Sequence, residues 1–274
     1  MKTINSVLNL LLPVSYLVTV VIYTLAFFSK GTFTKKIKTP FLFLTLALHL
    51  IYIISRTIYL QHPPIITVFD MFCLLAFAIA ASYRVIEILT GLKNTGVLIL
   101  ALSLVFQTIS SLFIRDVFDV PAALHSYTLG IHVLSALIGY SAFSIAAVYG
   151  LLYLLQYNNL KSKKFGVFFE MLPNLEHLEQ LTRLSILFGF ILLSVAIIIG
   201  IIWLPIAIEN YSMLDPKLIG TIFVWIIYAA GVYLIRGGRG TGKQIMRFAI
   251  GGFVITLCSL TILNLYFKTF HRFF

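Results

Sequence analysis

Apolar runs of about 20 residues recur along the whole chain and constrain its fold more than any other feature. A helix needs roughly that many mostly apolar residues to cross the hydrocarbon core of a bilayer. Since 60% of the 274 residues are hydrophobic and only 11% are charged, the chain has the composition of an integral membrane protein. No stretch is long enough for a separate globular domain, so we expect a single transmembrane domain over residues 1–274.

Charged residues, glycines and prolines separate these runs, which predicts an all-α polytopic bundle of about eight transmembrane helices. The expected spans lie near residues 7–28, 39–60, 65–88, 95–114, 127–157, 184–204, 218–235 and 245–267. The first run is long for a signal-peptide core and ends in LAFFSK, without the small residues of a cleavage site. We therefore interpret it as a retained span.

The distribution of basic residues predicts the orientation of the chain. Fourteen of the 20 Lys and Arg residues fall in the connections after the first, third, fifth and seventh expected spans. Because cytoplasmic loops are enriched in Lys and Arg, this bias places both termini outside. Basic loops facing anionic membrane lipid also account for the formal net charge of +11, so a nucleic-acid partner is not needed to explain it.

The longest cytoplasmic connection, residues 158–183, has an amphipathic pattern. A basic cluster is followed by aromatic residues and then by leucines spaced three apart with glutamates between them. This pattern predicts a segment that lies along the membrane surface. It could also dock a soluble partner.

Two smaller motifs are interpreted as structural. GGRGTGKQ, residues 237–244, fits part of a phosphate-binding loop, but Gln244 stands where that loop needs Ser or Thr, and no strand precedes it. We expect a tight glycine-rich turn whose cations contact lipid headgroups. Cys73 and Cys258 lie in separate expected spans, where we interpret them as small apolar residues without a redox role.

Histidines are the polar residues that most need an explanation. In HSYTLGIHVLSALIGYSAF, residues 125–143, His125 lies at the outer end of the fifth span and His132 two turns deeper, about 10.5 Å along the helix. His271 follows the eighth span on the same side, and His49 lies in the middle of the second. Imidazole in hydrocarbon is costly unless it is paired, lines a polar cavity or binds a ligand.

Three interpretations of these histidines remain open. A single buried histidine is most simply explained by an interhelical hydrogen bond. Two outer histidines on different helices could instead ligate heme iron from opposite faces, since heme needs an apolar slot and imidazole ligands. A closed zinc site is the weaker alternative, because it needs four converging nitrogen or sulfur ligands. The remaining histidines, His62 and His177, are expected in solvent-exposed loops.

Two carboxylates in or beside the expected spans have structural and functional interpretations. Asp70 is predicted to pair with Arg56, with a hydrogen bond to a ligating histidine as the alternative. Asp215 precedes Pro216 and suits the first position of a helix, with contact to a heme pocket as the alternative. Neither has a nucleophile or a second acid beside it in the sequence, so we expect no enzyme activity.

Several segments together resemble a known family. They are HVLSALIGYSAF from His132, LPNLEHLEQLTRLSILFGF at 172–190, Trp203 with the later Asp-Pro-Lys at 215–217, NLYFKTFH at 264–271 and ALHLIYIISR at 47–56. In order and spacing these segments resemble the HemX and CcsA branch of the cytochrome c assembly superfamily of heme-handling membrane proteins. The resemblance runs across nearly the whole chain from the second span onward.

The resemblance implies a protein that binds heme b, with histidines as axial ligands of the iron. Carried over by position, His132 and His271 match the pair that flanks an outer heme site, and His49 matches the histidine of a heme site inside the membrane. Trp203 and Asp215 lie in the stretch that corresponds to the family's tryptophan-rich segment and are expected at the heme pocket. His125 matches no ligand position, although its helical register with His132 keeps it as a reserve ligand.

Two features of the family are absent from this sequence. WLPIAIENYSMLDPKL, residues 203–218, keeps the Asp-Pro-Lys and one upstream Trp where heme-presenting members carry clustered tryptophans. GVYLIRGG, residues 231–238, has no histidine where the partner of the intramembrane histidine is expected. These departures favour a HemX-like protein over a full cytochrome c synthase subunit.

The resemblance thus implies heme transport, presentation or sensing, linked to cytochrome c assembly or heme biosynthesis, in a bacterial cytoplasmic (inner) membrane. The partners that it implies are heme, membrane lipid and a cytochrome c assembly protein or glutamyl-tRNA reductase. Two alternatives remain open, namely a cofactor-free membrane regulator acting through residues 158–183 and a transporter of another small molecule. The sequence shows no convincing inverted repeat and few intramembrane charges for such a transporter.

Overall fold

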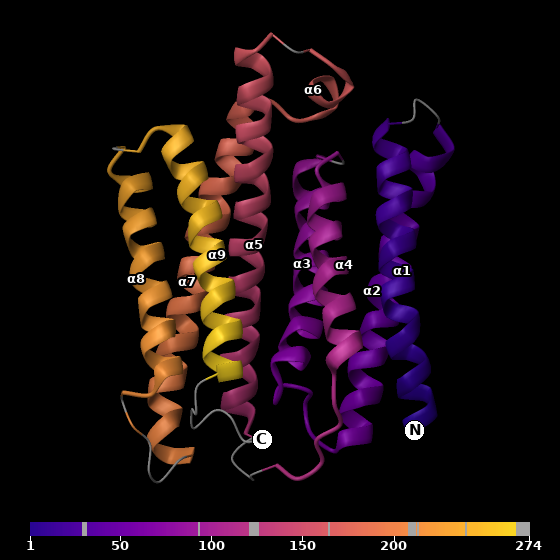
Figure 1. The fold of residues 1–274 in the computed structure, drawn as a ribbon, viewed down its shortest axis with the longest axis vertical. Coiled ribbons are helices and arrows are strands. Elements are labelled where there is room, and N and C mark those ends of the chain that lie inside the picture. The colour runs from indigo at the N-terminus through magenta and orange to yellow at the C-terminus, as the bar shows by residue number, and fades with distance from the viewer. Residues whose placement is uncertain are drawn as a thin grey trace. The chain divides into compact units, whose positions relative to one another are not determined.

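The computed structural model describes residues 1–28, 32–92, 94–120, 126–163, 165–207, 212, 214–238 and 240–266. Within these ranges every regular element is a helix, which confirms the predicted all-α class (Figure 1). Eight of the helices are long and apolar enough to cross a membrane, as the sequence predicts.

The helix bounds differ from the expected spans mainly at the ends. The long helices are α1 (Lys2–Phe28), α2 (Thr32–Leu60), α3 (Val68–Thr90), α4 (Gly96–Phe113), α5 (Tyr127–Lys161), α7 (Leu175–Ala207), α8 (Pro216–Arg236) and α9 (Gly242–Tyr266), and the short one is α6 (Val167–Met171). Helices α1, α2 and α7 begin well before their apolar runs, because a helix can continue beyond the hydrocarbon core where its polar turns meet water. The connection predicted at 158–183 therefore consists of the end of α5, α6 and the first turns of α7. Its contact with a membrane surface stays a prediction.

The distribution of side chains is that of a protein surrounded by lipid. Large apolar side chains such as Leu10, Phe43 and Leu112 are 73%, 68% and 71% exposed. Polar side chains such as His49 and Arg56 are buried, with 0% and 3% exposed. Extended apolar exposure marks a membrane-facing surface, and ionisable residues within membrane helices face the bundle interior. This inverted pattern supports the multi-pass membrane assignment.

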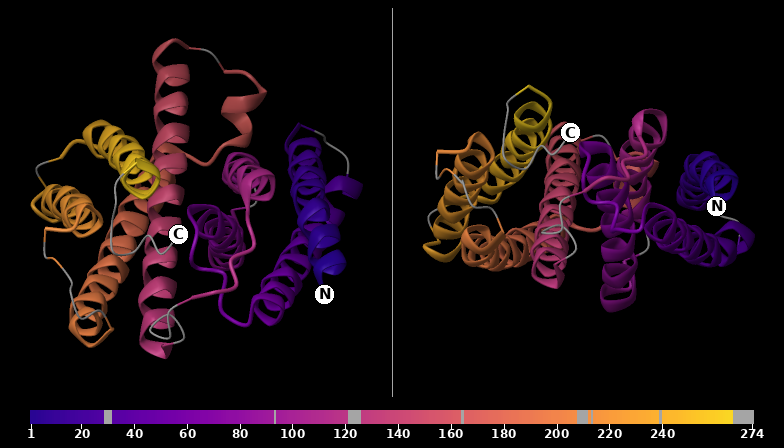
Figure 2. Two further views of the ribbon diagram at one scale, coloured as in Figure 1. Left: turned by 60° about the horizontal axis from the view of Figure 1, so that its bottom comes forward. Right: turned by 90° about the horizontal axis from the view of Figure 1, so that it is seen from below.

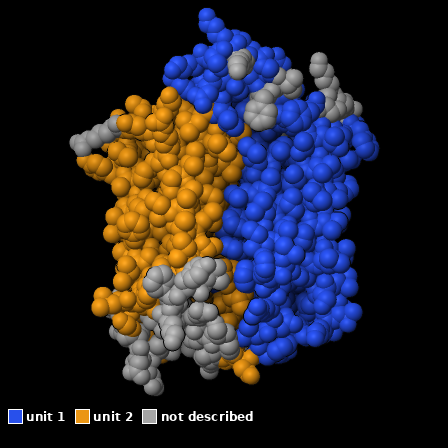
Figure 3. Space-filling view, viewed as in Figure 1, with its two compact units in different colours: residues 1–64, 69–118, 155–175 blue, residues 65–68, 119–154, 176–274 orange. Residues whose placement is uncertain are grey.

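The contacts divide the chain into two compact units (Figure 3). Unit 1 comprises the described residues within 1–64, 69–118 and 155–175, and unit 2 those within 65–68, 119–154 and 176–274. In unit 1, α1 packs against α2 and α4, and in unit 2, α8 packs against α9. Both views of Figure 2 show the α1–α2 and α8–α9 pairs side by side. The expectation of a single domain stays a prediction.

Local chemistry explains the starts of the last two long helices. Asp215 is the N-cap of α8, accepts a hydrogen bond from the Lys217 N–H at 2.8 Å and is followed by Pro216, as predicted. Before α9, the Thr241 N–H donates to Gln244 Oε1 at 3.0 Å, and the Gln244 N–H donates to Thr241 Oγ1 at 3.4 Å. This reciprocal pair is a capping box. It explains the glutamine that departs from the phosphate-binding motif.

A close helix crossing within unit 2 positions the candidate site. A Cβ added to Gly139 of α5 would lie 3.2 Å from the Gly189 carbonyl oxygen of α7, and one added to Gly189 would lie 3.0 Å from the Gly139 carbonyl oxygen. Glycine at both positions lets the two backbones approach closely, since a Cβ at either one would push the neighbouring backbone away by a few tenths of an ångström. Because the helices touch here, side chains two turns further along each of them can reach the backbone of the other.

Candidate functional site

The structure describes four of the six residues predicted at the site, namely His49, His132, Trp203 and Asp215. His125 and His271 lie outside the described residues. The pairing of His132 with His271, and the reserve role of His125, therefore stay predictions.

His132 lies near the start of α5, and its ring reaches across to α7. The distance from its Nδ1 to the backbone carbonyl oxygen of Ala196 is 2.7 Å. A carbonyl oxygen only accepts hydrogen bonds, so Nδ1 carries the proton and Nε2 carries the lone pair. No described residue forms a hydrogen bond with Nε2. Within the described part of the chain, His132 thus has one nitrogen held by the protein and one without a hydrogen-bond partner.

Gly200 gives the His132 ring its place against α7. A Cβ at position 200 would lie 2.9 Å from His132 Cε1, closer than real Cβ contacts, and 3.0 Å from Nδ1, which is also a tight contact. Neither Gly200 nor Ala196 is among the residues predicted from the sequence. The signal that could have found them is the spacing of two small residues one helical turn apart, which permits close approach in membrane helices.

Trp203 lies about one turn beyond Gly200 in α7 and is 7% exposed. It shares an apolar cluster with Leu129, one turn before His132 in α5. Partly buried apolar residues complete this cluster: Ile65, Ile66, Val120 and Val133. The structure therefore brings an aromatic side chain and an apolar surface to the end of unit 2 that holds His132.

The start of α8 belongs to the same end of unit 2. Asp215 is 4% exposed and its carboxylate caps the helix, which confirms the structural interpretation of this residue. Lys217, two residues later, is half-buried and lies close enough to His132 to act on it electrostatically. The Asp-Pro-Lys segment thus brings a positive charge near the histidine.

His49 has a different environment in unit 1. Its Nδ1 lies 2.9 Å from the Tyr16 hydroxyl, and its Nε2 lies 3.2 Å from Cys73 Sγ. The ring also makes an edge contact with Phe77, and the side chain is fully buried. Because both nitrogens have protein partners, neither is available to iron in this arrangement. The structure matches the interpretation that His49 forms interhelical hydrogen bonds. Cys73 was predicted to be only a small apolar residue, but its thiol also contacts the His49 ring.

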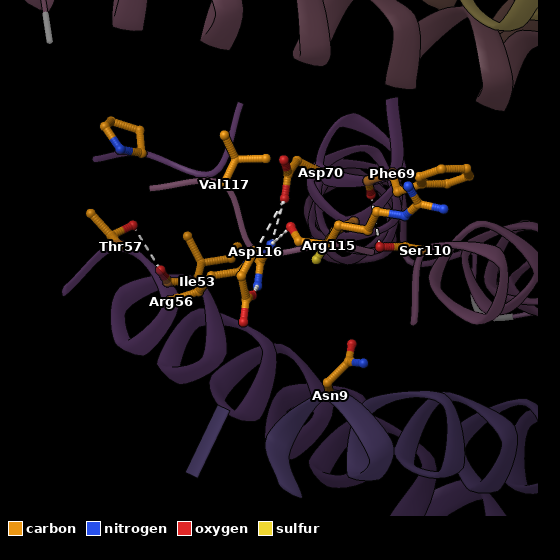
Figure 4. Close-up of polar contacts among 12 residues, drawn as sticks. Asn9, Ile53, Arg56, Thr57, Phe69, Asp70, Ser110, Arg115, Asp116 and Val117 are labelled. Carbon is orange, nitrogen blue, oxygen red and sulfur yellow. Dashed lines mark hydrogen bonds and ion pairs between the residues drawn. The ribbon is translucent and has the colours of Figure 1, made fainter. Parts of the chain in front are cut away.

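The predicted pair of Arg56 and Asp70 is confirmed, and it belongs to a larger cluster (Figure 4). Arg56 Nη2 lies 3.3 Å from Asp70 Oδ1, and both side chains are 3% exposed. The guanidinium also contacts Asp116 Oδ1 at 2.9 Å and donates to the Arg115 carbonyl oxygen at 2.7 Å. This cluster joins α2 and α3 to the segment that follows α4.

A second charged cluster of unit 1 surrounds Glu87, which is 2% exposed. Its carboxylate contacts Arg84 Nη1 at 3.3 Å and Lys38 Nζ at 3.9 Å, and it accepts from the Tyr23 hydroxyl at 3.3 Å. Lys38 and Arg84 are among the 14 basic residues that were expected in the alternate, cytoplasmic connections. The structure places them in α2 and α3, where they neutralise a buried carboxylate.

The remaining two histidines also differ from expectation. His62 is 3% exposed, and its ring nitrogens each lie 2.8 Å from a carbonyl oxygen, those of Pro63 and Val117. The prediction of a solvent-exposed loop is wrong for His62, because the segments around it fold over the ring. His177 is exposed as expected, but it lies in the first turns of α7 rather than in a loop.

The described residues contain no group of three or more His, Cys, Asp and Glu side chains that could hold a metal ion. The donor that could serve a metal-containing cofactor in this part of the chain is Nε2 of His132. One imidazole beside an aromatic and apolar surface suits a flat macrocycle that brings its own four nitrogen ligands.

Comparison with known proteins gives one consistent result. The sequence profile of a family described as "Cytochrome C assembly protein" matches residues 5–271. The chain is 26% identical to Protein HemX of Brevibacillus brevis over 225 residues, which cover 80% of each chain. It is 27% identical to the cytochrome c biogenesis protein CcsA of Guillardia theta over 258 residues, covering 85% of this chain and 86% of that one. Protein HemX of Bacillus subtilis is 31% identical over 109 residues, 40% of each chain.

Proposed function

Because the chain belongs to the cytochrome c assembly protein family, we propose that it handles heme as a multi-pass protein of a bacterial cytoplasmic membrane. His132 would hold heme b near the extracytoplasmic face as a histidine ligand of its iron. The role of the protein is to transport, present or sense heme for cytochrome c assembly or heme biosynthesis. No catalytic step is assigned to it.

The proposal rests on the hydrogen bonding of the two ring nitrogens of His132. Histidines that ligate metals commonly donate their other ring N–H to a carbonyl or carboxylate oxygen, which selects the tautomer and orients the ring. His132 has this arrangement, with Nδ1 on the Ala196 carbonyl oxygen at 2.7 Å and Nε2 free of described partners. His49 does not have it, since both of its nitrogens are engaged.

The neighbouring residues suit the rest of a porphyrin. Trp203 and its apolar cluster place aromatic and apolar side chains at the His132 end of unit 2, which suits an apolar macrocycle. Lys217 offers a positive charge near His132, and heme carries two negatively charged propionates. When bound, the heme iron would supply the ligand-binding and electron-accepting centre, while this chain's residues hold, orient and shield it.

Absorption spectroscopy of purified protein supplied with heme tests the proposal. We expect His132→Ala and His271→Ala each to reduce or shift the Soret band. His177→Ala is the matched control, since this exposed histidine lies in the same helix as Ala196, about 30 Å along its axis. Soret bands that are unchanged in both the His132 and His271 variants would overturn the proposed ligation.

A further inference from the structure

We infer that Gly200 and the Ala196 carbonyl of α7 form a seat that selects the proton position of His132 and thereby presents Nε2 to heme iron. This inference rests on the proposed function. It adds a positioning role for two residues that do not themselves touch the iron. We refer to Ala196 and Gly200 together as the imidazole seat.

The hydrogen bond between His132 Nδ1 and the Ala196 carbonyl oxygen selects the tautomer. Neutral imidazole exists in two tautomers, and only the one protonated at Nδ1 can donate to a carbonyl oxygen through that nitrogen. Nδ1 lies 2.7 Å from the Ala196 oxygen, within the range of a good hydrogen bond. The other tautomer would set a lone pair against this oxygen. The seat therefore stabilises the tautomer whose Nε2 can ligate iron.

The absence of a side chain at Gly200 leaves room for the His132 ring against the α7 backbone. The Ala196 oxygen is one turn from Gly200, so a ring that reaches the first must pass over the second. A Cβ at position 200 would meet His132 Cε1 at 2.9 Å and Nδ1 at 3.0 Å. Nδ1 is the bonded nitrogen and Cε1 is its neighbour in the rigid ring, so the ring must move as a whole to make room for a methyl group at 200. It must lift away from α7, which lengthens the hydrogen bond.

The contact between α5 and α7 limits how far the two helices can move relative to each other. The Gly139–Gly189 crossing holds α5 against α7 two turns from the seat. Because the two backbones already touch at this point, their packing opposes the helix shift by which a lifted ring would regain its bond. Loss of the groups that orient a ligating histidine typically weakens metal binding by 10- to 100-fold. We expect an effect of that size, about tenfold or more, from one added methyl group at position 200.

The test combines a spectrum of the heme-free protein with a heme titration. Nitrogen-15 histidine labelling of the full chain in detergent micelles reports which ring nitrogen of His132 is protonated, and a His132→Gln variant identifies the signal. We expect protonation at Nδ1 in the wild type. In Gly200→Ala we expect this preference to weaken and heme affinity to fall about tenfold or more. Gly251→Ala is the control, because a Cβ at 251 in α9 has no neighbour within 4 Å.

The possible results distinguish a failure of the imidazole seat from a failure of the proposed heme binding. A wild type that binds no heme overturns the proposed function. A wild type that binds heme through His132, while Gly200→Ala has the same proton position and the same affinity, overturns the inference alone. If Gly200→Ala does not fold, the wild-type spectrum decides, since protonation at Nε2 of His132 in the heme-free protein contradicts the seat.

Discussion

Arg56 Nη2 lies 3.3 Å from Asp70 Oδ1, and the two side chains are each only 3% exposed. An ion pair so deeply buried is costly to break on one side, because the remaining charge loses a partner at a position where water cannot replace it. The pair joins α2 to the first turn of α3 in unit 1. Its role is therefore in the packing of unit 1, and it is a feature whose energetic weight can be measured.

We expect Asp70→Asn to destabilise the protein by about 1 to 3 kcal/mol, less than the full cost of an unpaired buried charge, because Arg56 keeps its contact with Asp116. Unfolding in mixed detergent and SDS micelles measures this free energy. Asp116→Asn is the control, because its side chain is 33% exposed and water can compensate. A loss there of about 1 kcal/mol or less is expected. Equal losses in both variants would show that the Asp70 contact has no special weight.

For His49 we expect His49→Leu to leave the heme spectrum unchanged, because both ring nitrogens already bind protein atoms. Stability should fall by about 1 to 3 kcal/mol, since the Tyr16 hydroxyl loses its close partner. That hydroxyl keeps only a 3.5 Å contact with the Ala76 carbonyl oxygen. Adding Tyr16→Phe removes the stranded hydroxyl and should restore part of the loss. A Soret band that disappears in His49→Leu would make His49 a ligand after all.

Gln244→Ser would complete the residue pattern of a phosphate-binding loop, and we expect it to create no nucleotide site. The segment is flanked by α8 and α9 and not by a strand and a helix. The variant should instead lose the bond from the Thr241 N–H, at a cost of about 1 kcal/mol. Gln244→Glu keeps an acceptor for the capping box and serves as the control. Binding of a fluorescent ATP analogue by Gln244→Ser would refute this interpretation.

The excess of basic residues in alternate connections predicts that both termini lie outside. Alkaline phosphatase, which is active only outside the cytoplasm, should be active when fused after residue 274 and inactive when inserted near Lys161. A green fluorescent protein at the same two positions should give the reverse pattern. Activity only at the inserted position would put the His132 end of α5 on the cytoplasmic side, against the proposed extracytoplasmic heme site.

Much of the secondary structure could be predicted because its causes are local. The thickness of the hydrocarbon core sets the length of each apolar run, so the eight spans follow from counting residues. Helix starts depend on a few neighbouring residues, which is why the Asp215 cap was predictable. The Arg56–Asp70 pair was also predictable, because each of these charges needs an opposite charge nearby when it is removed from water.

What only the tertiary structure decided is which atoms of different helices meet. Sequence periodicity shows that His49 and His132 lie within apolar helices. It does not show that His49 has both nitrogens occupied while one nitrogen of His132 has no partner among the described residues. That difference depends on helix crossings, such as the Gly139–Gly189 contact. It also depends on the Ala196 backbone carbonyl, which is present in every residue type and therefore gives no signal in the sequence. The sequence determines which chemical groups each side chain carries. The packing of segments far apart in the chain determines which atoms those groups contact.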